Sequence, residues 1–220
     1  MPENVNIIII GAAGDGRSVA DLIESNISKL KKNWYLLGYL DDDPKKQRMI
    51  VNDYPVLGPL TDIYKYKDCK FIVSIGSVRN FLNKREIINK LKLSSENYMT
   101  LIHADVQISK YASIGIDCIL HTGTYIGANS IIKNHIKFLP FTVINHDTII
   151  NDFCNFGSQC SIAGNVEIEE SCYIGMNVSV REDVTIGEGS LIGMGSVITK
   201  DVPPFSKVVG NPGRIIGNVK

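Results

Sequence analysis

A six-residue repeat dominates the second half of the chain. From Ile102 to Ile198 every sixth residue is large and apolar, at all seventeen positions and without a slip in register. The residue two places before each of them is small or β-branched, as at Val106 and Ala112, so a second inward-facing column has the same period. Neither an α-helix nor an ordinary strand has a period of six, whereas short strands joined by turns around a triangular prism do, with three hexads per coil. The repeat therefore predicts a parallel β-helix of about five coils, stacked at the ~4.8 Å spacing of strands into a rod roughly 25 Å tall.

Four of the five cysteines fall in the column of small inward residues. Cys118, Cys154, Cys160 and Cys172 occupy that position, and the sequence contains no C-x-x-C spacing. Small buried cysteines pack like other apolar residues, so we interpret these four as core residues rather than metal ligands or a redox pair. An odd number of cysteines without a disulfide-like spacing is typical of a reducing compartment, and the sequence predicts a cytoplasmic protein.

The first half of the chain follows a different pattern. Between Asn6 and about Met99, "NIIIIG", "WYLLGYLDDD" and "KFIVSIGS" are typical of buried strands, and "SVADLIESNISKL" and "RNFLNKREIINKLK" are typical of amphipathic helices. Strands separated by helices form parallel sheets with right-handed crossovers. We therefore predict two domains, an α/β Rossmann-like half domain over residues 1–100 and an all-β parallel β-helix over residues 101–220.

The charge balance limits the kinds of partner. Lysines plus arginines and aspartates plus glutamates both number 23, so the formal net charge is zero. Nucleic acids and anionic membranes usually bind to a basic surface, so neither is an expected partner. The apolar run from Ile7 to Ile10 is too short for a signal peptide or a membrane span. We therefore expect no membrane insertion.

Several features together resemble a known family. The hexad repeat, the C-terminal segment "KDVPPFSKVVGNPGRII" and the nucleotide-binding pattern of the first half extend over residues 6–219, and "INHD" places a His-Asp pair within the repeat. In this combination the chain resembles the left-handed β-helix, hexapeptide-repeat acyltransferases, and in particular the PglD/NeuD-like acetyltransferases of nucleotide-linked amino sugars and sialic acid. The resemblance implies a left-handed coil, acetyl-CoA as co-substrate, no metal, and a homotrimer with active sites between subunits.

The His-Asp pair lies at a position where side chains point away from the rod. His146 is the second residue after Ile144 in the hexad register and Asp147 is the third, which places both at a corner between strands. The resemblance implies that His146 is the general base, a role that suits an imidazole at neutral pH. It further implies that Asp147 assists the ring and that the backbone N–H of Gly164 meets the thioester oxygen. The alternative is an exposed histidine without a catalytic role.

The other three histidines give a weaker signal. His103 and His121 each follow a large hexad residue and are one coil apart, so they would stack on one another. Two ligands without a third make a poor metal site, and we expect both at exposed corners. His135 has no evident partner in the sequence. The sequence therefore predicts no metal site.

The C-terminal segment is expected to hold the acetyl donor. The resemblance implies that this segment packs over acetyl-CoA, with cations near its phosphates and glycine main chain along its pantetheine arm, where a side chain would crowd the ligand. The residues assigned in this way are Lys200, Arg214, Gly175, Gly193 and Gly195. The alternative is that the prolines and glycines of this region only cap the rod.

The glycine-rich turn after the first strand is the expected acceptor site. Its pattern is G-x-x-G-x-G rather than the G-x-G-x-x-G of dinucleotide folds, and the half domain has only about three βα units, so an NAD oxidoreductase is disfavoured. A nucleotide-linked sugar fits better, with its diphosphate at the glycine turn and its base or ribose at the acids that close the second strand. The residues assigned in this way are Gly11, Gly14, Asp15, Gly16, Arg17, Asp41 and Asp42. The alternative is a purely structural glycine turn.

Three positions depart from the family pattern. Where the family usually has Gly-His-Gly in the turn, this chain has Asp15, and an anion is unfavourable beside a diphosphate. We therefore expect Asp15 to contact a sugar or ribose hydroxyl. Leu139 stands where the family often has an asparagine before the base. Asn155 stands where some members have a second histidine near the acetyl group, and we expect it to donate a hydrogen bond at the acetyl-CoA site.

These observations predict an acetyl-CoA-dependent N-acetyltransferase. The expected acceptor is a nucleotide-linked 4-amino-4,6-dideoxyhexose, and the expected setting is the synthesis of a surface polysaccharide or glycan. The sugar amine would attack the acetyl carbon directly, without an acyl-enzyme. Two alternatives stay open at this point: O-acetylation of sialic acid or a related sugar, and a scaffold or sugar-nucleotide sensor without catalytic activity.

Overall fold

The first half of the molecule is built on one sheet. The computed structural model describes residues 4–219, and within this range the strand order of the sheet is β3-β4-β2-β1-β5. The strands are β1 (Val5–Ile10), β2 (Trp34–Leu40), β3 (Ile50–Val51), β4 (Tyr54–Gly58) and β5 (Lys70–Val73). The helices are α1 (Gly14–Leu30) and α2 (Asn83–Leu91), with 3-10 turns η1 (Pro44–Lys46), η2 (Leu60–Lys65) and η3 (Ser95–Asn97). β1 pairs in parallel with β2 and β5, which confirms the predicted strands and the crossover through α1.

The β3–β4 hairpin was not predicted. β3 has only two residues and pairs antiparallel with β4, which in turn lies parallel to β2. A two-residue strand has no measurable side-chain alternation, and Pro55 lacks the N–H that a central strand needs. The hairpin extends the sheet on the β2 side, away from the edge formed by β5.

The second half is a left-handed parallel β-helix of three sheets, here named C, D and E in the order in which each coil visits them. Sheet C contains β6 (Leu101–Ile102), β9 (Ile119–Leu120), β12 (Lys137–Phe138), β15 (Asn155–Phe156), β18 (Tyr173–Ile174), β21 (Leu191–Ile192), β23 (Ser206–Val209) and β24 (Arg214–Asn218). Sheet D contains β7 (Gln107–Ile108), β10 (Tyr125–Ile126), β13 (Val143–Ile144), β16 (Ser161–Ile162), β19 (Ser179–Val180) and β22 (Val197–Ile198). Sheet E contains β8 (Ser113–Ile114), β11 (Ile131–Ile132), β14 (Ile149–Ile150), β17 (Glu167–Ile168) and β20 (Thr185–Ile186).

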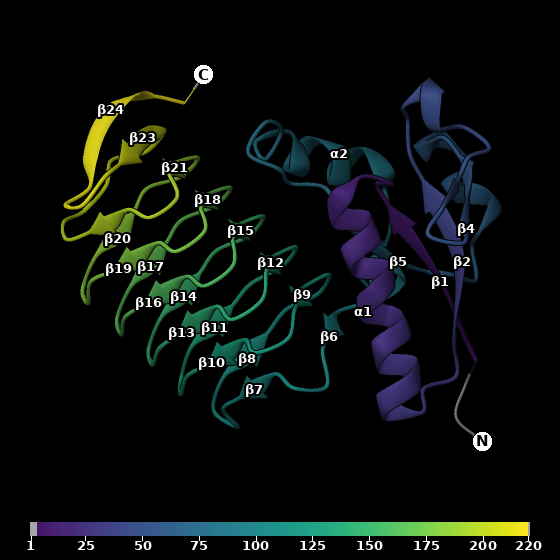
Figure 1. Ribbon diagram of the computed structural model, residues 1–220, viewed down its shortest axis with the longest axis horizontal. Helices are drawn as coiled ribbons and strands as arrows, with labels where there is room; N and C mark the ends of the chain where they lie inside the picture. The colour runs from purple at the N-terminus through teal and green to yellow at the C-terminus, as the bar shows by residue number, and fades with distance from the viewer. Residues whose placement is uncertain (1–3, 220) are drawn as a thin grey trace.

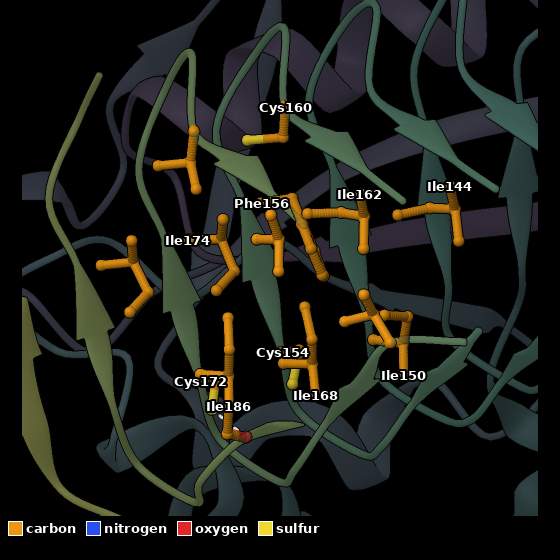
Figure 2. Packing of buried hydrophobic residues seen from close by; sticks show 14 of the residues in the cluster. Ile144, Ile150, Cys154, Phe156, Cys160, Ile162, Ile168, Cys172, Ile174 and Ile186 are labelled. Carbon is orange, nitrogen blue, oxygen red and sulfur yellow. Dashed lines mark hydrogen bonds between the residues drawn. The ribbon is translucent and has the colours of Figure 1, made fainter. Parts of the chain in front are cut away.

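The residues that the hexad repeat predicts to face inward form the core of the rod. Each of the seventeen large apolar residues is the second residue of one strand from β6 to β22, and from Leu120 to Ile198 they are at most 3 % exposed. They stack directly on their counterparts one coil away, as Figure 2 shows for Ile144 and Ile162. Cys154 and Cys172 lie in the adjacent inward column, as predicted.

The corners of the prism explain where polar residues interrupt the repeat. The corner between sheets D and E contains, in successive coils, Asn129, Asp147, Asn165 and Asp183, each with φ between 56° and 60°. This left-handed conformation turns the chain sharply, and Asn and Asp adopt it more readily than other non-glycine residues. A polar residue is therefore expected here once per coil, and the residue before it points outward.

The first half of the molecule covers the outer face of sheet C (Figure 1). Leu101 and Ile119, which point outward from this sheet, pack with Ile7 and Ile9 of β1 in one apolar cluster. The amide of Asn26 on α1 also donates to the backbone oxygen of Ile102, at 2.7 Å. Residues 4–219 contain no helix with both the length and the apolar character needed to cross a bilayer.

Candidate active site

His146 lies at the exposed D/E corner, in the turn between β13 and β14. Its side chain is 62 % exposed, and its Nδ1 lies 2.8 Å from Oδ2 of Asp147. The amide of Asn129, one coil earlier, donates to Oδ1 of the same carboxylate at 3.0 Å. Asn129 was not identified from the sequence, although its position 18 residues before Asp147 places it directly below in the stack.

The carboxylate of Asp147 determines which nitrogen of His146 faces solvent. The hydrogen bonds from Asn129 and then from His146 lower the pKa of Asp147, so this carboxyl group is ionised at neutral pH. An ionised carboxylate only accepts hydrogen bonds, so Nδ1 of His146 carries the proton of this contact. The neutral ring therefore presents its Nε2 lone pair outward, as a general base requires.

Gly164 lies directly against the imidazole ring. A Cβ at this position would be 2.5 Å from Cε1 and 2.7 Å from Nε2 of His146, so only glycine leaves room for the ring. The carbonyl oxygen of Gly164 accepts from Asp183, whereas its N–H donates to no backbone carbonyl within the described chain. A backbone donor is thus available beside the imidazole of His146.

A cavity lies further along the same corner. Lys200 follows β22 at the position that His146 occupies three coils earlier, which corresponds to ~14 Å along the rod. Lys200 and Arg214 both line a cavity of about 420 Å³ with Pro212 and Gly213 of the C-terminal segment. The structure thus brings together the two cations that the sequence assigned to the acetyl donor.

The three glycines assigned to the pantetheine arm lie on a different corner. Gly175, Gly193 and Gly195 follow strands β18 and β21 of sheet C, so they lie at the C/D corner and not at the corner of His146. A Cβ on Gly175 would be 2.6 Å from the backbone nitrogen of Met194, whereas Gly195, with φ of 70°, faces open space. Of the three, only Gly195 combines a required backbone conformation with free surface.

A cavity beside the sheet lies at the carboxyl ends of β1, β2 and β5. It measures about 480 Å³, and its lining includes five of the residues assigned to the acceptor: Gly11, Gly14, Asp15, Asp41 and Asp42. Ligands of open parallel sheets commonly bind at this edge. Below, "the pocket" refers to this cavity.

Sequence reasoning missed the opposite wall of the pocket, which is formed by Ser74, Gly76, Ser77, Asn80 and Ile87, and it also missed Lys46. The "SIGS" that follows the third predicted strand could have indicated this wall.

Two residues assigned to the acceptor do not line the pocket. Gly16 packs so closely against the backbone of Gly11 that a Cβ on Gly16 would collide with the carbonyl oxygen of Gly11. Gly16 therefore allows α1 to pack close to the end of β1. Arg17 is exposed and lies outside the lining. Gly16 therefore has a structural role in the turn, and Arg17 does not contribute to the lining.

The carboxylate of Asp41 holds the backbone around the pocket in place through hydrogen bonds. Its carboxylate accepts from the backbone N–H groups of Ala12 and Asp43 and from the ammonium of Lys46, at 2.8 to 2.9 Å. Burial alone would raise the pKa of Asp41, but these three hydrogen bonds outweigh it and lower the pKa. Asp41 therefore fixes the turn that follows β1, while the exposed Asp42 caps the backbone of Leu60 at 2.8 Å.

The side of the pocket nearest the rod lies over a buried polar cluster. The ammonium of Lys137 on β12 forms an ion pair with Asp15, and Lys137 is 3 % exposed. Lys137 and Asn155 are partners in adjacent strands, and Asn155 accepts from Lys84 of α2 at 3.3 Å. Asn155 is 1 % exposed, so it offers no free surface to acetyl-CoA and we exclude it from the donor site.

Burial of Lys84 predicts a specific pH dependence of stability. Burial, and then repulsion by Lys137, lower the pKa of Lys84 from 10.5 to about 8. Between these two values the unfolded chain binds the proton that the folded chain has released, so the free energy of unfolding rises with pH across this window. Lys84→Met should therefore be more stable than wild type below pH 8, with an advantage that shrinks by up to ~3 kcal/mol as the pH rises to about 10.5. Urea denaturation of both proteins at one subunit concentration measures this difference, and an advantage that is constant over the window would contradict the assignment.

The remaining histidines occupy the joint between the two halves. His121 is 7 % exposed and His103 is also largely covered, because α1 packs over this corner, so the expectation of exposed corners was wrong. Burial lowers the pKa of His121 to about 4. His135, for which the sequence indicated no partner, lies 2.8 Å from the buried carboxylate of Asp117. Among the described residues no three His, Cys, Asp or Glu side chains form a metal-binding group.

The pocket and His146 lie on opposite sides of the rod. The pocket belongs to the α/β half, which covers sheet C (Figure 1). His146 lies between β13 and β14 at the D/E corner, which is the vertex of the triangle opposite that sheet. Within one chain the rod therefore separates the two parts of the predicted active site.

Comparison with known proteins supports both halves of this description. The PglD N-terminal domain family matches residues 6–91. The bacterial transferase hexapeptide family matches residues 165–200, and the hexapeptide repeat of succinyl-transferase matches residues 147–182. No curated protein sequence matches the chain significantly.

Solved structures match the whole chain. The acetyltransferase domain of PglB from Neisseria gonorrhoeae in complex with acetyl coenzyme A is 27 % identical, with a TM-score of 0.85 over 97 % of this chain and 100 % of that one. WeeI from Acinetobacter baumannii is also 27 % identical, with a TM-score of 0.82 over 96 % and 100 %. PerB from Caulobacter crescentus in complex with CoA and GDP-perosamine, at 24 % identity and a TM-score of 0.81 over 99 % and 100 %, shares the fold. With its PglD-type first half, its hexapeptide rod and these full-length matches, the chain belongs to the PglD/NeuD-like family of left-handed β-helix, acetyl-CoA-dependent sugar acetyltransferases.

Proposed function

We propose that this protein transfers the acetyl group of acetyl-CoA to the amine of a nucleotide-linked 4-amino-4,6-dideoxyhexose, with His146 as general base. The observation that carries the proposal is the outward-facing imidazole, oriented by Asp147 and packed against Gly164. Acetyl transfer to an amine needs a group that accepts a proton as nitrogen attacks carbon, and a histidine with a free Nε2 is such a group.

The reaction needs no covalent enzyme intermediate. The neutral amine attacks the thioester carbon, and the carbonyl oxygen becomes an oxyanion beside the N–H of Gly164. Nε2 of His146 takes the proton from the attacking nitrogen, and Asp147 stabilises the resulting imidazolium. The C–S bond then breaks, and the proton passes from His146 to the departing CoA thiolate. The products are the N-acetylated sugar and free CoA, and the histidine returns to its neutral form.

Each active site is shared between two subunits of a homotrimer. Because the rod separates the pocket from His146 of the same chain, an acceptor held in one pocket meets His146 of a neighbour. Acetyl-CoA lies along the D/E corner, with its acetyl group at His146 and its phosphates near Lys200 and Arg214. Gly195 of the C/D corner, which faces open space, lines the groove from the adjacent subunit. The glycine turn, with Gly14, faces the diphosphate of the acceptor.

The known ligands of similar structures fit this assignment. The PglB domain was solved with acetyl coenzyme A, and PerB with CoA and GDP-perosamine. The pocket of about 480 Å³ at the ends of parallel strands is the part of this chain that suits a nucleotide. The described range 4–219 contains no membrane-spanning helix, and the proposed site of action is the cytoplasm, where acetyl-CoA and sugar nucleotides are available.

Release of CoA thiol from acetyl-CoA tests the proposal. The assay uses UDP-, dTDP- and GDP-linked 4-amino-4,6-dideoxyhexoses and free sialic acid as acceptors. We expect turnover with one of the amino sugar-nucleotides and a mass increase of the sugar by one acetyl group. Turnover with sialic acid alone would instead establish O-acetylation, and no turnover with any acceptor would favour a scaffold or sensor.

A further inference from the structure

The outer face of sheet C carries one unexpected interruption. This face is buried against the α/β half, and its outward column reads Leu101, Ile119, Lys137, Asn155, Tyr173 and Leu191 along the rod. Four of the six are apolar or aromatic, as expected of a buried joint. Lys137 and Asn155 occupy the centre of the column and are 3 % and 1 % exposed. An ammonium in this position costs desolvation energy, and apolar residues of similar size would usually be at least as stable.

The polar centre of the joint lies directly beneath the pocket. Lys137 reaches the carboxylate of Asp15, whose side chain is 36 % exposed and which lines the pocket at the start of α1. Asn155 lies against Gly76 of the opposite wall, where a Cβ would collide with its side-chain amide. Asp15 and Gly76 line the pocket, and Lys137 and Asn155 lie directly behind them in the joint.

The lining of the pocket contains more carboxylates than ammonium groups, with Asp15, Asp41 and Asp42 against Lys46. Behind this lining, Lys137 and Lys84 are two buried ammonium groups, and among residues 4–219 Asp15 is the one carboxylate in direct contact with either of them. The next buried carboxylate, Asp117, is occupied by His135 and by the backbone N–H of Val73. The ion pair with Lys137 therefore offsets one of the three negative charges that a polyanion would meet in the pocket.

We propose that Lys137 is the residue that allows the pocket to bind a nucleoside diphosphate, because its buried ammonium neutralises the carboxylate of Asp15 at the point where the diphosphate lies. The inference rests on the proposed function, since it concerns the same pocket and the same class of acceptor. It assigns to Lys137 a role in acceptor binding that acts through Asp15, and Lys137 does not take part in the transfer step.

Calorimetric binding of UDP, dTDP and GDP to the full trimer tests the inference without any transfer reaction. Lys137→Met keeps the length of the side chain but leaves Asp15 as an uncompensated anion, so the nucleotide that binds wild type most tightly should bind about 10- to 30-fold more weakly. Adding Asp15→Asn to Lys137→Met removes the anion as well, and this double variant should bind within about threefold of wild type. The ratio of the Kd of Lys137→Met to that of wild type should also fall as NaCl is raised, because salt screens the repulsion.

Lys29→Met provides the matched control. Lys29 of α1 pairs with Asp105 of the rod at 3.1 Å, so it also bridges the two halves, but this pair is half-exposed and lies outside the pocket. We expect no change in nucleotide binding for this variant. Asp15→Asn alone, which leaves the buried lysine in place, should bind the nucleoside diphosphate at least as tightly as wild type and keeps the test valid if Lys137→Met does not fold.

Several outcomes would overturn the inference. A double variant as weak as Lys137→Met would show that the lysine only holds the joint together, and a tenfold loss in Asp15→Asn would contradict the charge argument. Failure of all three nucleotides to bind wild type would remove the pocket assignment itself. Acetyl transfer is measured separately. If Lys137→Met binds nucleotide as wild type does and transfer is active, the inference about Lys137 is refuted and the proposed function is not. The expected binding changes without transfer to any acceptor would refute only the proposed function.

Discussion

Replacing His146 with glutamine should lower kcat for acetyl transfer about 10²- to 10⁴-fold, which is the usual contribution of a general base. Glutamine has a similar size and can still donate to Asp147, but it cannot take up the proton of the attacking amine. The side chain is 62 % exposed and contributes no core packing, so folding and assembly should not change. The measurement is the rate of CoA thiol release at saturating acetyl-CoA, with circular dichroism and the mass of the assembly as checks on folding.

Lys110→Gln is the matched control for this experiment. Lys110 occupies the same exposed position of the D/E corner two coils earlier in the rod, on the side of His146 away from Lys200 and the proposed path of acetyl-CoA. The kcat of this variant should stay within about threefold of wild type, as for most exposed substitutions away from the reacting atoms. If His146→Gln were as active as Lys110→Gln, His146 would be a surface histidine, and the base would have to be another group.

Asn129→Ala should have a smaller effect in the same direction. The variant removes the hydrogen bond that Oδ1 of Asp147 accepts, so the carboxylate orients His146 less well but still contacts it. A loss of kcat of about 3- to 30-fold is expected, because second-sphere hydrogen bonds generally contribute less than the group they orient. A loss as large as that of His146→Gln, measured in the same assay, would instead indicate a direct role for Asn129.

The rod could be predicted to the individual residue, whereas the joint between the halves could not. A period of six fixes which side chains face inward, so Ile144, Cys154 and the outward position of His146 follow from spacing alone. The same spacing says that Lys137 and His121 leave the core, but not that another part of the chain covers them. The burial of both residues could not be predicted from spacing, since it depends on where α1, about 100 residues earlier in the chain, packs.

The acceptor site could be predicted only in part, for a similar reason. The glycine turn and the acids after β2 are local signals, and they identified Gly11, Gly14 and Asp42 as lining residues. The SIGS segment after β5 is a local signal of a turn, but its place as the opposite wall depends on the pairing of β5 with β1, which this segment does not specify. Asp41 has the residue type expected of a ribose ligand, but its hydrogen bonds to Ala12 and Lys46 use it to hold the turn instead.

Two inactive variants should restore activity to each other when they assemble in one trimer. Gly14→Phe fills the pocket, and its Cβ meets only the end of the Arg17 side chain at 3.8 Å, so the backbone can accept the substitution. Neither this variant nor His146→Gln should acetylate the acceptor alone. In a closed ring of three subunits in which each pocket faces the His146 of the next, any mixed trimer contains one intact site, so about one third of wild-type activity should return.

Co-expression of the two variants with different affinity tags, followed by purification on both tags, isolates the mixed trimers. Trimers of each single variant, purified in the same way, are the controls and should stay inactive. The KM of the mixed trimers for acetyl-CoA should equal that of the wild type, because their one intact site is complete. If the pocket and His146 of one chain formed the site together, every subunit of the mixed trimer would still contain one defect and no activity would return. The experiment thus separates a shared site from a site within one chain by the presence or absence of turnover.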